Sequence, residues 1–200
     1  MPYAYRRLTP SERTEVIEER RVRGFPLHSP PHAYDEAGCF LITAACFGHA
    51  PIMDLPERRT SFQDCLLSAL QASNVTVHGW VVLPNHYHIL VESMPLALVS
   101  TAIKRVHGST SRDWNAADGL TGRRRVWFRY SDRLIRNDAH YYRALNYVHY
   151  NPVKHGYVES PYAWEWSSLP EYLDQRGSEW LRETWRRYMP DSMGRGWDEG

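Results

Sequence analysis

Residues 79–92 read GWVVLPNHYHILVE and place two apolar runs on either side of a Pro84-Asn85 pair. Each run has the apolar content of a buried strand, and the pair between them predicts a tight turn or break. His86 and His88 lie two positions apart in the second run. Because side chains at i and i+2 of a strand point to the same face of a sheet, we expect both imidazoles to project together.

Two imidazoles on one face can form a two-pronged metal site. Imidazole is the commonest metal ligand in proteins, and an oxygen ligand with water would complete the site and leave positions for a substrate phosphate. The alternative is that both histidines are polar positions of a strand whose other face is buried. An H-x-H motif alone favours that alternative, because short motifs are ambiguous.

Three blocks occur in a fixed order along the chain. They are residues 79–90, with V-V-L-P-N-H-Y-H-I-L, residues 145–158, with N-P-V-K-H-G-Y-V, and residues 164–168, W-E-W-S-S. Together they resemble signatures of the single-tyrosine HUH transposases, in particular the REP-associated tyrosine transposases and their insertion-sequence relatives. The resemblance covers about residues 35 to 172, and three ordered blocks are more specific than any one of them.

The resemblance implies an enzyme: a metal-dependent single-strand DNA endonuclease and strand transferase that acts on single-stranded or hairpin DNA through a 5′-phosphotyrosine intermediate. It makes His86 and His88 the ligands of a divalent cation, Mg²⁺ or Mn²⁺. A second class is a domesticated transposase that binds hairpins without cutting them. A zinc-stabilised structural domain is a poor third reading, because two histidines without cysteine partners do not close a tetrahedral site.

Residues 127–136, WFRYSDRLIR, resemble the family segment that carries the nucleophile, and Tyr130 is the matching tyrosine. The match is one residue shorter than the family pattern, and Ser131 stands where a second aromatic residue often follows. The alternative role for Tyr130 is a strand-end aromatic that covers the core. Tyr147 is the other candidate nucleophile, although its place before Asn151 suits packing.

The spacing does not show which residue completes the metal site. Asp132, Asn137, Asp138 and His140 follow Tyr130 and are candidate third ligands. Asn85 is expected to be a turn residue that positions His86, because asparagine tolerates the backbone conformations of turns. His149 and His155 are expected to serve helix capping and surface contacts.

The net charge is only +1, but its distribution is uneven. Residues 104–136 hold nine basic side chains against three aspartates, a local balance of +6, while residues 171–200 hold seven acids against five arginines. A basic segment with aromatic neighbours is suited to nucleic acid, whereas a solvated charged face is the alternative. The candidate DNA-binding residues are Arg105, Arg123, Arg124, Arg125, Arg129 and Trp127.

The sequence predicts an α+β fold. Apolar patterns predict strands over 39–47, 75–83, 86–92 and 125–130, with helices over 61–72 and 96–114. The order β-α-β-β-α-β is that of a ferredoxin-like domain with an antiparallel sheet. A helix from Asp138 is expected to end at Asn151-Pro152, and residues 161–173 to fold back as a C-terminal clamp.

We expect three regions along the chain. Residues 1–33 are expected to form an N-terminal helical arm, with a helix over 12–23 and a proline-rich linker, and residues 174–200 a charged tail. Residues 34–173 form the region that the family resemblance identifies as an HUH-type catalytic domain. Cys39, Cys46 and Cys65 are an odd number without metal-site spacing, which argues against a disulfide framework. No apolar run has the length of a membrane span and no signal peptide precedes the domain, so we expect a cytoplasmic monomer or homodimer.

Overall fold

The computed structural model of the chain describes residues 9–22, 37–120 and 124–190. It divides into two units, of which residues 34–193 form the larger. The smaller unit contains helix α2 (Pro10–Val22), which confirms the predicted N-terminal helix. Thr9 and Glu12 form a capping box there: the Thr9 backbone N–H donates to the Glu12 carboxylate at 2.7 Å, and the Glu12 N–H donates to the Thr9 hydroxyl at 3.4 Å.

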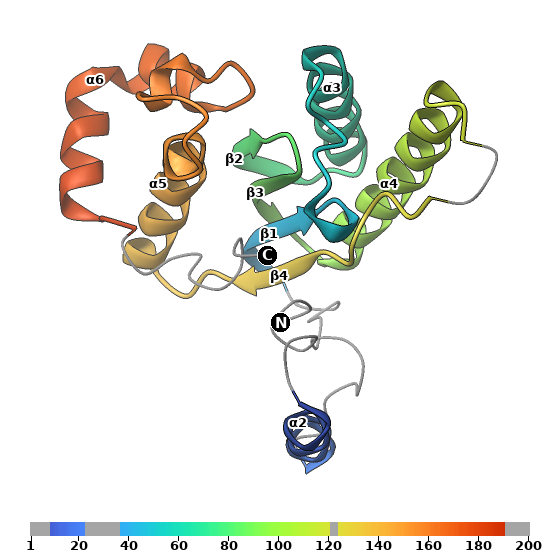
Figure 1. Cartoon of the computed structure of the whole chain (residues 1–200). Coiled ribbons are helices and arrows are strands. Elements are labelled where there is room, and N and C mark those ends of the chain that lie inside the picture. The colour runs from blue at the N-terminus through green and yellow to red at the C-terminus, as the bar shows by residue number, and fades with distance from the viewer. Residues whose placement is uncertain (1–8, 23–36, 121–123, 191–200) are drawn as a thin grey trace. The chain divides into compact units, whose positions relative to one another are not determined.

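The larger unit is built on a four-stranded antiparallel sheet (Figure 1). Its strands are β1 (Gly38–Ala45), β2 (Thr76–Val82), β3 (His86–Ser93) and β4 (Ser131–Leu134), in the spatial order β2-β3-β1-β4. Helix α3 (Pro56–Ala72) joins β1 to β2, and α4 (Ala97–Ala117) joins β3 to β4. The predicted β-α-β-β-α-β order and the α+β class are therefore confirmed.

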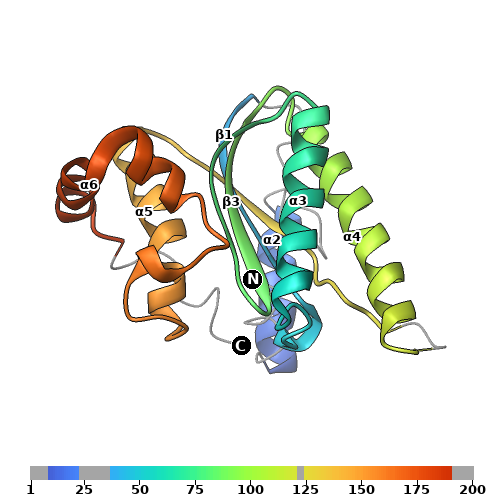
Figure 2. The ribbon, with the colours of Figure 1, turned by 90° about the horizontal axis from the view of Figure 1, so that it is seen from above.

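Two helical layers cover the sheet (Figure 2). Helices α3 and α4 lie on one face, and α5 (Asp138–Lys154) with α6 (Leu169–Arg187) lies on the other. Successive side chains of β3 point alternately toward the two helical layers. Tyr87, Ile89 and Val91 belong to the main hydrophobic core on the α3–α4 face, so His86 and His88 point to the face of α5.

The fourth strand is not where the sequence predicts it. Residues 125–130 form only an isolated bridge, between Trp127 and Cys46, and the ladder with β1 begins at Ser131. The reason is that β1 ends at Ala45 and the chain turns into a short 3₁₀ helix, Phe47–His49. The segment beside that turn has no regular strand left to pair with.

Helix α5 also runs further than predicted. It passes through Asn151 and Pro152 and ends at Lys154. A proline near the end of a helix removes a single backbone hydrogen bond. The next turn remains closed, because the His155 N–H donates to the Asn151 carbonyl at 3.1 Å.

The predicted clamp is present at the edge of β2. The Val82 N–H donates to the Trp166 carbonyl at 2.9 Å, and the Ser168 N–H donates to the Trp80 carbonyl at 3.0 Å. Helix α6 then continues through residue 173, the expected end of the domain, and kinks at Gly177, which has a φ of 82°. Its far end is held to α5 by the Asn146 side chain, which donates to the carbonyls of Thr184 and Tyr188. None of the helices in the described ranges is long and apolar enough to cross a membrane.

Candidate active site

The two histidines of β3 lie side by side on the buried face of the sheet. Their ring centroids are 5.0 Å apart, and His86 and His88 are 2% and 0% exposed. Buried polar groups require partners, because an unsatisfied one costs about 1–3 kcal/mol. Each ring has an oxygen partner on each of its two nitrogens.

One nitrogen of each ring is held by the sheet and the turn before it. Nδ1 of His88 lies 2.7 Å from the hydroxyl of Thr43 on β1, and Nδ1 of His86 lies 2.7 Å from Oδ1 of Asn85. The Asn85 amide is oriented by its own Nδ2, which donates to the His49 carbonyl at 3.4 Å. Such contacts fix the ring orientation and tautomer of a metal-binding histidine. Asn85 thus positions His86, as the sequence predicts.

The other nitrogen of each ring faces helix α5. The hydroxyl of Tyr147 lies 3.3 Å from Nε2 of His88, and Oδ1 of Asn151 lies 3.1 Å from Nε2 of His86. Both α5 side chains are buried. The structure therefore brings a tyrosine and an amide oxygen to the histidine pair from one helix.

These residues fit a cation. Nδ1 of His86 lies beside Oδ1 of Asn85 and its Nε2 lies beside Oδ1 of Asn151, and in the tautomer that donates from Nδ1 the Nε2 lone pair is available to a cation. Nδ2 of Asn151 is buried without a partner among the described residues. Nε2 of His86, Nε2 of His88 and Oδ1 of Asn151 are the three groups that could hold a divalent cation here. Across the described ranges no three His, Cys, Asp or Glu side chains gather as an alternative site.

The four third ligands expected from the sequence lie elsewhere. Asp132 pairs with Ile42 of the core, so its side chain points to the opposite face of the sheet. Asn137 caps α5 by accepting from the His140 N–H at 2.9 Å, and Nδ1 of His140 accepts from the Arg136 N–H at 3.3 Å. Asp138 begins α5, more than two turns before Tyr147.

Tyr130 is likewise not brought to the histidine pair. It packs against the hydrophobic core on the α3–α4 face. There it lies near Tyr87, whose pKa is raised mainly by burial and further by Tyr130. Since Tyr87 alternates with His86 and His88 along β3, the sheet separates Tyr130 from both histidines.

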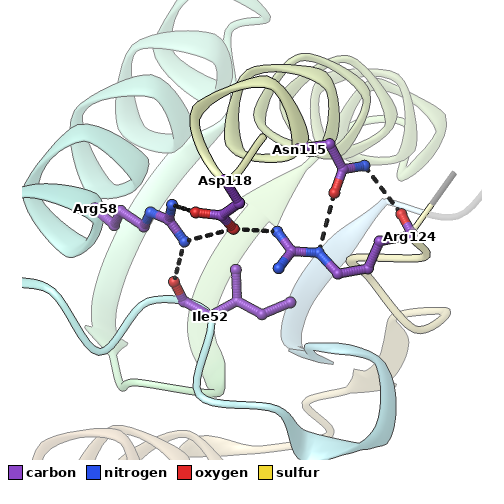
Figure 3. A network of polar contacts seen from close by, with 5 residues as sticks. All are labelled: Ile52, Arg58, Asn115, Asp118 and Arg124. Atoms are coloured by element: carbon purple, nitrogen blue, oxygen red, sulfur yellow. Dashed lines mark hydrogen bonds and ion pairs between the residues drawn. The ribbon is translucent and has the colours of Figure 1, made fainter. Parts of the chain in front are cut away.

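Two of the candidate DNA-binding side chains are engaged inside the fold. Trp127 is 7% exposed, donates from Nε1 to the Thr110 hydroxyl at 3.0 Å and stacks on His107 at a centroid distance of 4.2 Å, so it offers no face for a base. Arg124 bonds the Asn115 side chain and forms an ion pair with Asp118 at 2.7 Å (Figure 3).

The Arg124 network ties three segments together. Asp118, just after α4, also pairs with Arg58 of α3, and Arg58 donates to the Ile52 carbonyl at 3.1 Å (Figure 3). The two guanidinium groups lower the pKa of the Asp118 carboxyl, mainly through the hydrogen bond from Arg58. The network therefore connects α3, the residue after α4, the loop at Ile52 and Arg124.

The DNA-binding role of the other candidate arginines stays a prediction. Arg105 and Arg129 are exposed, and Arg125 is exposed above the rings of Phe47 and Phe128, at 4.7 and 5.1 Å. Arg123 lies outside the described residues.

Sequence reasoning missed several residues around the pair. Asn151 follows Tyr147 by four positions, a spacing that places both on one face of a helix and was visible in the sequence. Lys154 lies with Nζ 5.1 Å from the Tyr147 ring centroid, and the ring of His155 lies 4.8 Å from that of His86. Thr43 had no sequence signal, because its contact depends on the register between β1 and β3.

The fold and the site together define a class of α+β proteins. Its members have an antiparallel sheet with a histidine pair on a central strand, and this pair faces a tyrosine on a helix that covers the sheet. No family model matches the chain. In structure the chain is similar to a REP-associated tyrosine transposase solved bound to a REP hairpin, with a TM-score of 0.59, 21% identity and coverage of 74% of this chain and 86% of that one. This likeness supports the shared fold.

Two curated proteins are similar in sequence. A REP-associated tyrosine transposase of Haemophilus influenzae is 32% identical over 97 residues, which are 44% of this chain and 55% of the relative. The REP-associated tyrosine transposase of Escherichia coli K12 is 29% identical over 94 residues, 46% of this chain and 53% of the relative. The chain thus spans about half the length of the curated relatives it matches. The resemblance to REP-associated tyrosine transposases is confirmed.

Proposed function

We propose that the chain is a metal-dependent single-strand DNA endonuclease and strand transferase that acts on hairpin-bearing DNA, with Tyr147 as its nucleophile in place of Tyr130. The observation that carries this proposal is the 3.3 Å contact between the Tyr147 hydroxyl and Nε2 of His88. The names of the similar proteins, REP-associated tyrosine transposases, support the choice of substrate and reaction.

A cation at His86, His88 and Asn151 would supply Lewis acidity that polarises the scissile phosphate, and Mg²⁺ or Mn²⁺ is the ion we propose. The tyrosine is a weak nucleophile until it loses its proton, because a phenol has a pKa of about 10. Its burial on α5 holds the hydroxyl at a fixed distance from the histidines. A rigid helix therefore orients the attacking oxygen.

In the proposed step the Tyr147 oxygen bonds to the phosphorus while the bond from phosphorus to the 3′ oxygen of the preceding nucleotide breaks. The phenolic proton is lost and the leaving 3′ oxygen gains one, so the step is balanced. The product is a 5′-phosphotyrosine and a free 3′-hydroxyl. Because the covalent link conserves the energy of the phosphodiester, another 3′-hydroxyl can reverse the step and exchange strands.

The test is an incubation of labelled single-stranded hairpin DNA with Mg²⁺ or Mn²⁺, analysed on a denaturing gel. The unmodified chain should form a covalent adduct, Tyr147→Phe should form none, and Tyr130→Phe should form one. His86→Ala should lose cleavage but keep most hairpin affinity, since phosphate contacts supply most binding energy. An adduct mapped to Tyr130 would overturn the assignment. Hairpin binding without any adduct would favour the domesticated, non-cutting transposase.

A further inference from the structure

A polar stripe runs along α5 through the candidate nucleophile. Its members, spaced by three or four positions so that they share one helix face, are His140, Arg143, Tyr147, Asn151 and Lys154. Tyr147 and Asn151 in the middle are buried, whereas Arg143 and Lys154 toward the two ends are exposed. The stripe therefore has a buried reactive centre with an exposed cation on each side.

Strand β4 adds a further cation beside this stripe. Arg133 pairs with Leu41 of β1, two residues before Thr43, so Arg133 lies on the same face of the sheet as the Thr43 hydroxyl that holds His88. Partial burial lowers the pKa of Arg133, Arg136 lowers it further, and the nearby Tyr147 acts in the opposite direction. Arg133 thus lies on the face of the sheet that α5 covers, where Tyr147 and Arg136 influence its charge.

Three arginines act electrostatically on His140, at the start of α5. The Arg136 backbone N–H donates to Nδ1 of His140, which places the two residues in contact. The pKa of His140 is lowered by partial burial and then by Arg133, Arg136 and Arg143. Positive charges at neighbouring positions attract an anion, because their potentials add.

We propose that Arg133, Arg136 and Arg143 bind backbone phosphates on one side of the scissile phosphate and that Lys154 binds a phosphate on the other side. The DNA strand would then run past the exposed side chains of Arg143 and Lys154, which flank the buried Tyr147 along α5. Arginine suits this role because its planar fork matches phosphate oxygens. Along the helix axis the Cα of Arg143 lies about 6 Å from that of Tyr147, whereas Lys154 places its Nζ 5.1 Å from the Tyr147 ring centroid. This inference rests on the proposed function.

The experiment measures DNA binding by the full chain in a Tyr147→Phe background, so that no cleavage intervenes. Arg143→Gln and Lys154→Gln are compared with Arg112→Gln, an arginine on α4 whose side chain is 78% exposed, on the other side of the sheet. The probe is a hairpin with a single-stranded extension through the cut site. The first two variants should weaken binding about tenfold, as for loss of one charge-assisted hydrogen bond. Each should also flatten the slope of log K against log salt by about 0.7. Arg112→Gln should match the parent.

A second set of probes locates each contact. Single neutral methylphosphonates are placed along the extension, one position at a time. A neutral phosphate at a contacted position should weaken the parent but not the variant that already lacks the partner, because effects on one shared interaction are not additive. The position coupled to Arg143 and the position coupled to Lys154 should lie on opposite sides of the cut.

Two results would overturn the inference. One is a loss in Arg143→Gln no larger than in Arg112→Gln, and the other is coupling of both Arg143 and Lys154 to the same side of the cut. Failure of the proposed function has a different signature. The unmodified chain would then form no adduct, while the methylphosphonate positions, numbered from the base of the hairpin, would still reveal whether the strand follows α5.

Discussion

Tyr147 and Asn151 are one turn apart on α5, and each contacts a different histidine of the β3 pair. The Tyr147 hydroxyl is 3.3 Å from Nε2 of His88, and Oδ1 of Asn151 is 3.1 Å from Nε2 of His86. Tyr147 and Asn151 therefore move together, as parts of one helix. The docking of α5 on the sheet determines whether either can reach its histidine.

Gly79→Ala should disturb this docking. A Cβ at Gly79 of β2 would lie 2.6 Å from Cδ1 of Leu145 on α5, and Leu145 is only 1% exposed, so its side chain has little room to move. We expect a loss of about 1–3 kcal/mol in the free energy of unfolding and a fall in cleavage rate, measured by chemical denaturation and by the hairpin assay.

Gly108→Ala is the matched control for that substitution. Gly108 lies within α4, and a Cβ there would meet no atom within 4 Å. Because alanine favours a helix over glycine, this variant should gain about 0.5–1 kcal/mol and keep its cleavage rate. Equal destabilisation of both variants would contradict close packing of α5 on β2.

Thr43→Val should weaken metal binding without touching a ligand. It removes the hydroxyl that holds Nδ1 of His88 at 2.7 Å while keeping a branched side chain in β1. Loss of such a partner reduces metal affinity by about 10–100-fold, which calorimetric titration with Mn²⁺ can measure. Thr43→Ser retains the hydroxyl and should bind Mn²⁺ nearly as the parent does. If the valine variant binds Mn²⁺ normally, His88 does not need this contact.

Metal should also stabilise the fold, and Asn151 should decide how much. At a free Mn²⁺ concentration about 100 times Kd, the free energy of unfolding should rise by about 2.7 kcal/mol. Asn151→Leu removes one ligand oxygen and should lose most of this rise, whereas Asn151→Asp keeps an oxygen and should retain it. Thermal melts with and without Mn²⁺ provide the measurement. The same rise in the leucine variant would remove Asn151 from the ligand set.

His107 should make stability depend on pH. Burial lowers its pKa to about 3 in the folded chain, where the Tyr87 hydroxyl and the Trp127 ring face it. The unfolded state, with a pKa of about 6.5, therefore binds more protons. The free energy of unfolding falls as the pH drops from about 6.5 toward 3, by up to about 1.4 kcal/mol per pH unit from this group.

His107→Phe keeps an aromatic ring against Trp127 and removes the titrating group. Between pH 6.5 and 5, the free energy of unfolding of this variant should fall less steeply than that of the parent. The two slopes should differ by at most about 1.4 kcal/mol per pH unit, the contribution of one bound proton. Denaturant melts at several pH values test this difference. Parallel slopes in the two proteins would show that His107 takes up its proton without unfolding the chain.

The sequence predicted the fold well where patterns are local. The apolar runs around Pro84-Asn85, the helices over 61–72 and 96–114 and their order all appear in the structure. Strand β4 was placed too early in the sequence, because residues 126–128 pair with β1 only at its end, through the isolated Trp127–Cys46 bridge, and the regular ladder begins at Ser131.

The candidate site was predictable only in part. The H-x-H pair stands on one strand, so its common orientation follows from the period of a strand. The choice between Tyr130 and Tyr147 depends on which face of the sheet each approaches, and that depends on contacts distant in sequence. Tyr147 meets His88 across 59 positions of the chain, a relation that no local spacing encodes.

Strand β3 carries the histidines on one face and the core residues Tyr87 and Ile89 on the other. Inserting or deleting one residue within it would turn the imidazoles into the hydrophobic core and expel Tyr87 from it. The register of this strand is therefore constrained twice, by the histidines on one face and by the core residues on the other. We expect insertions or deletions of a single residue in β3 to abolish function. Substitutions of core residues by other apolar residues should be tolerated better, because they leave each side chain on its face of the sheet.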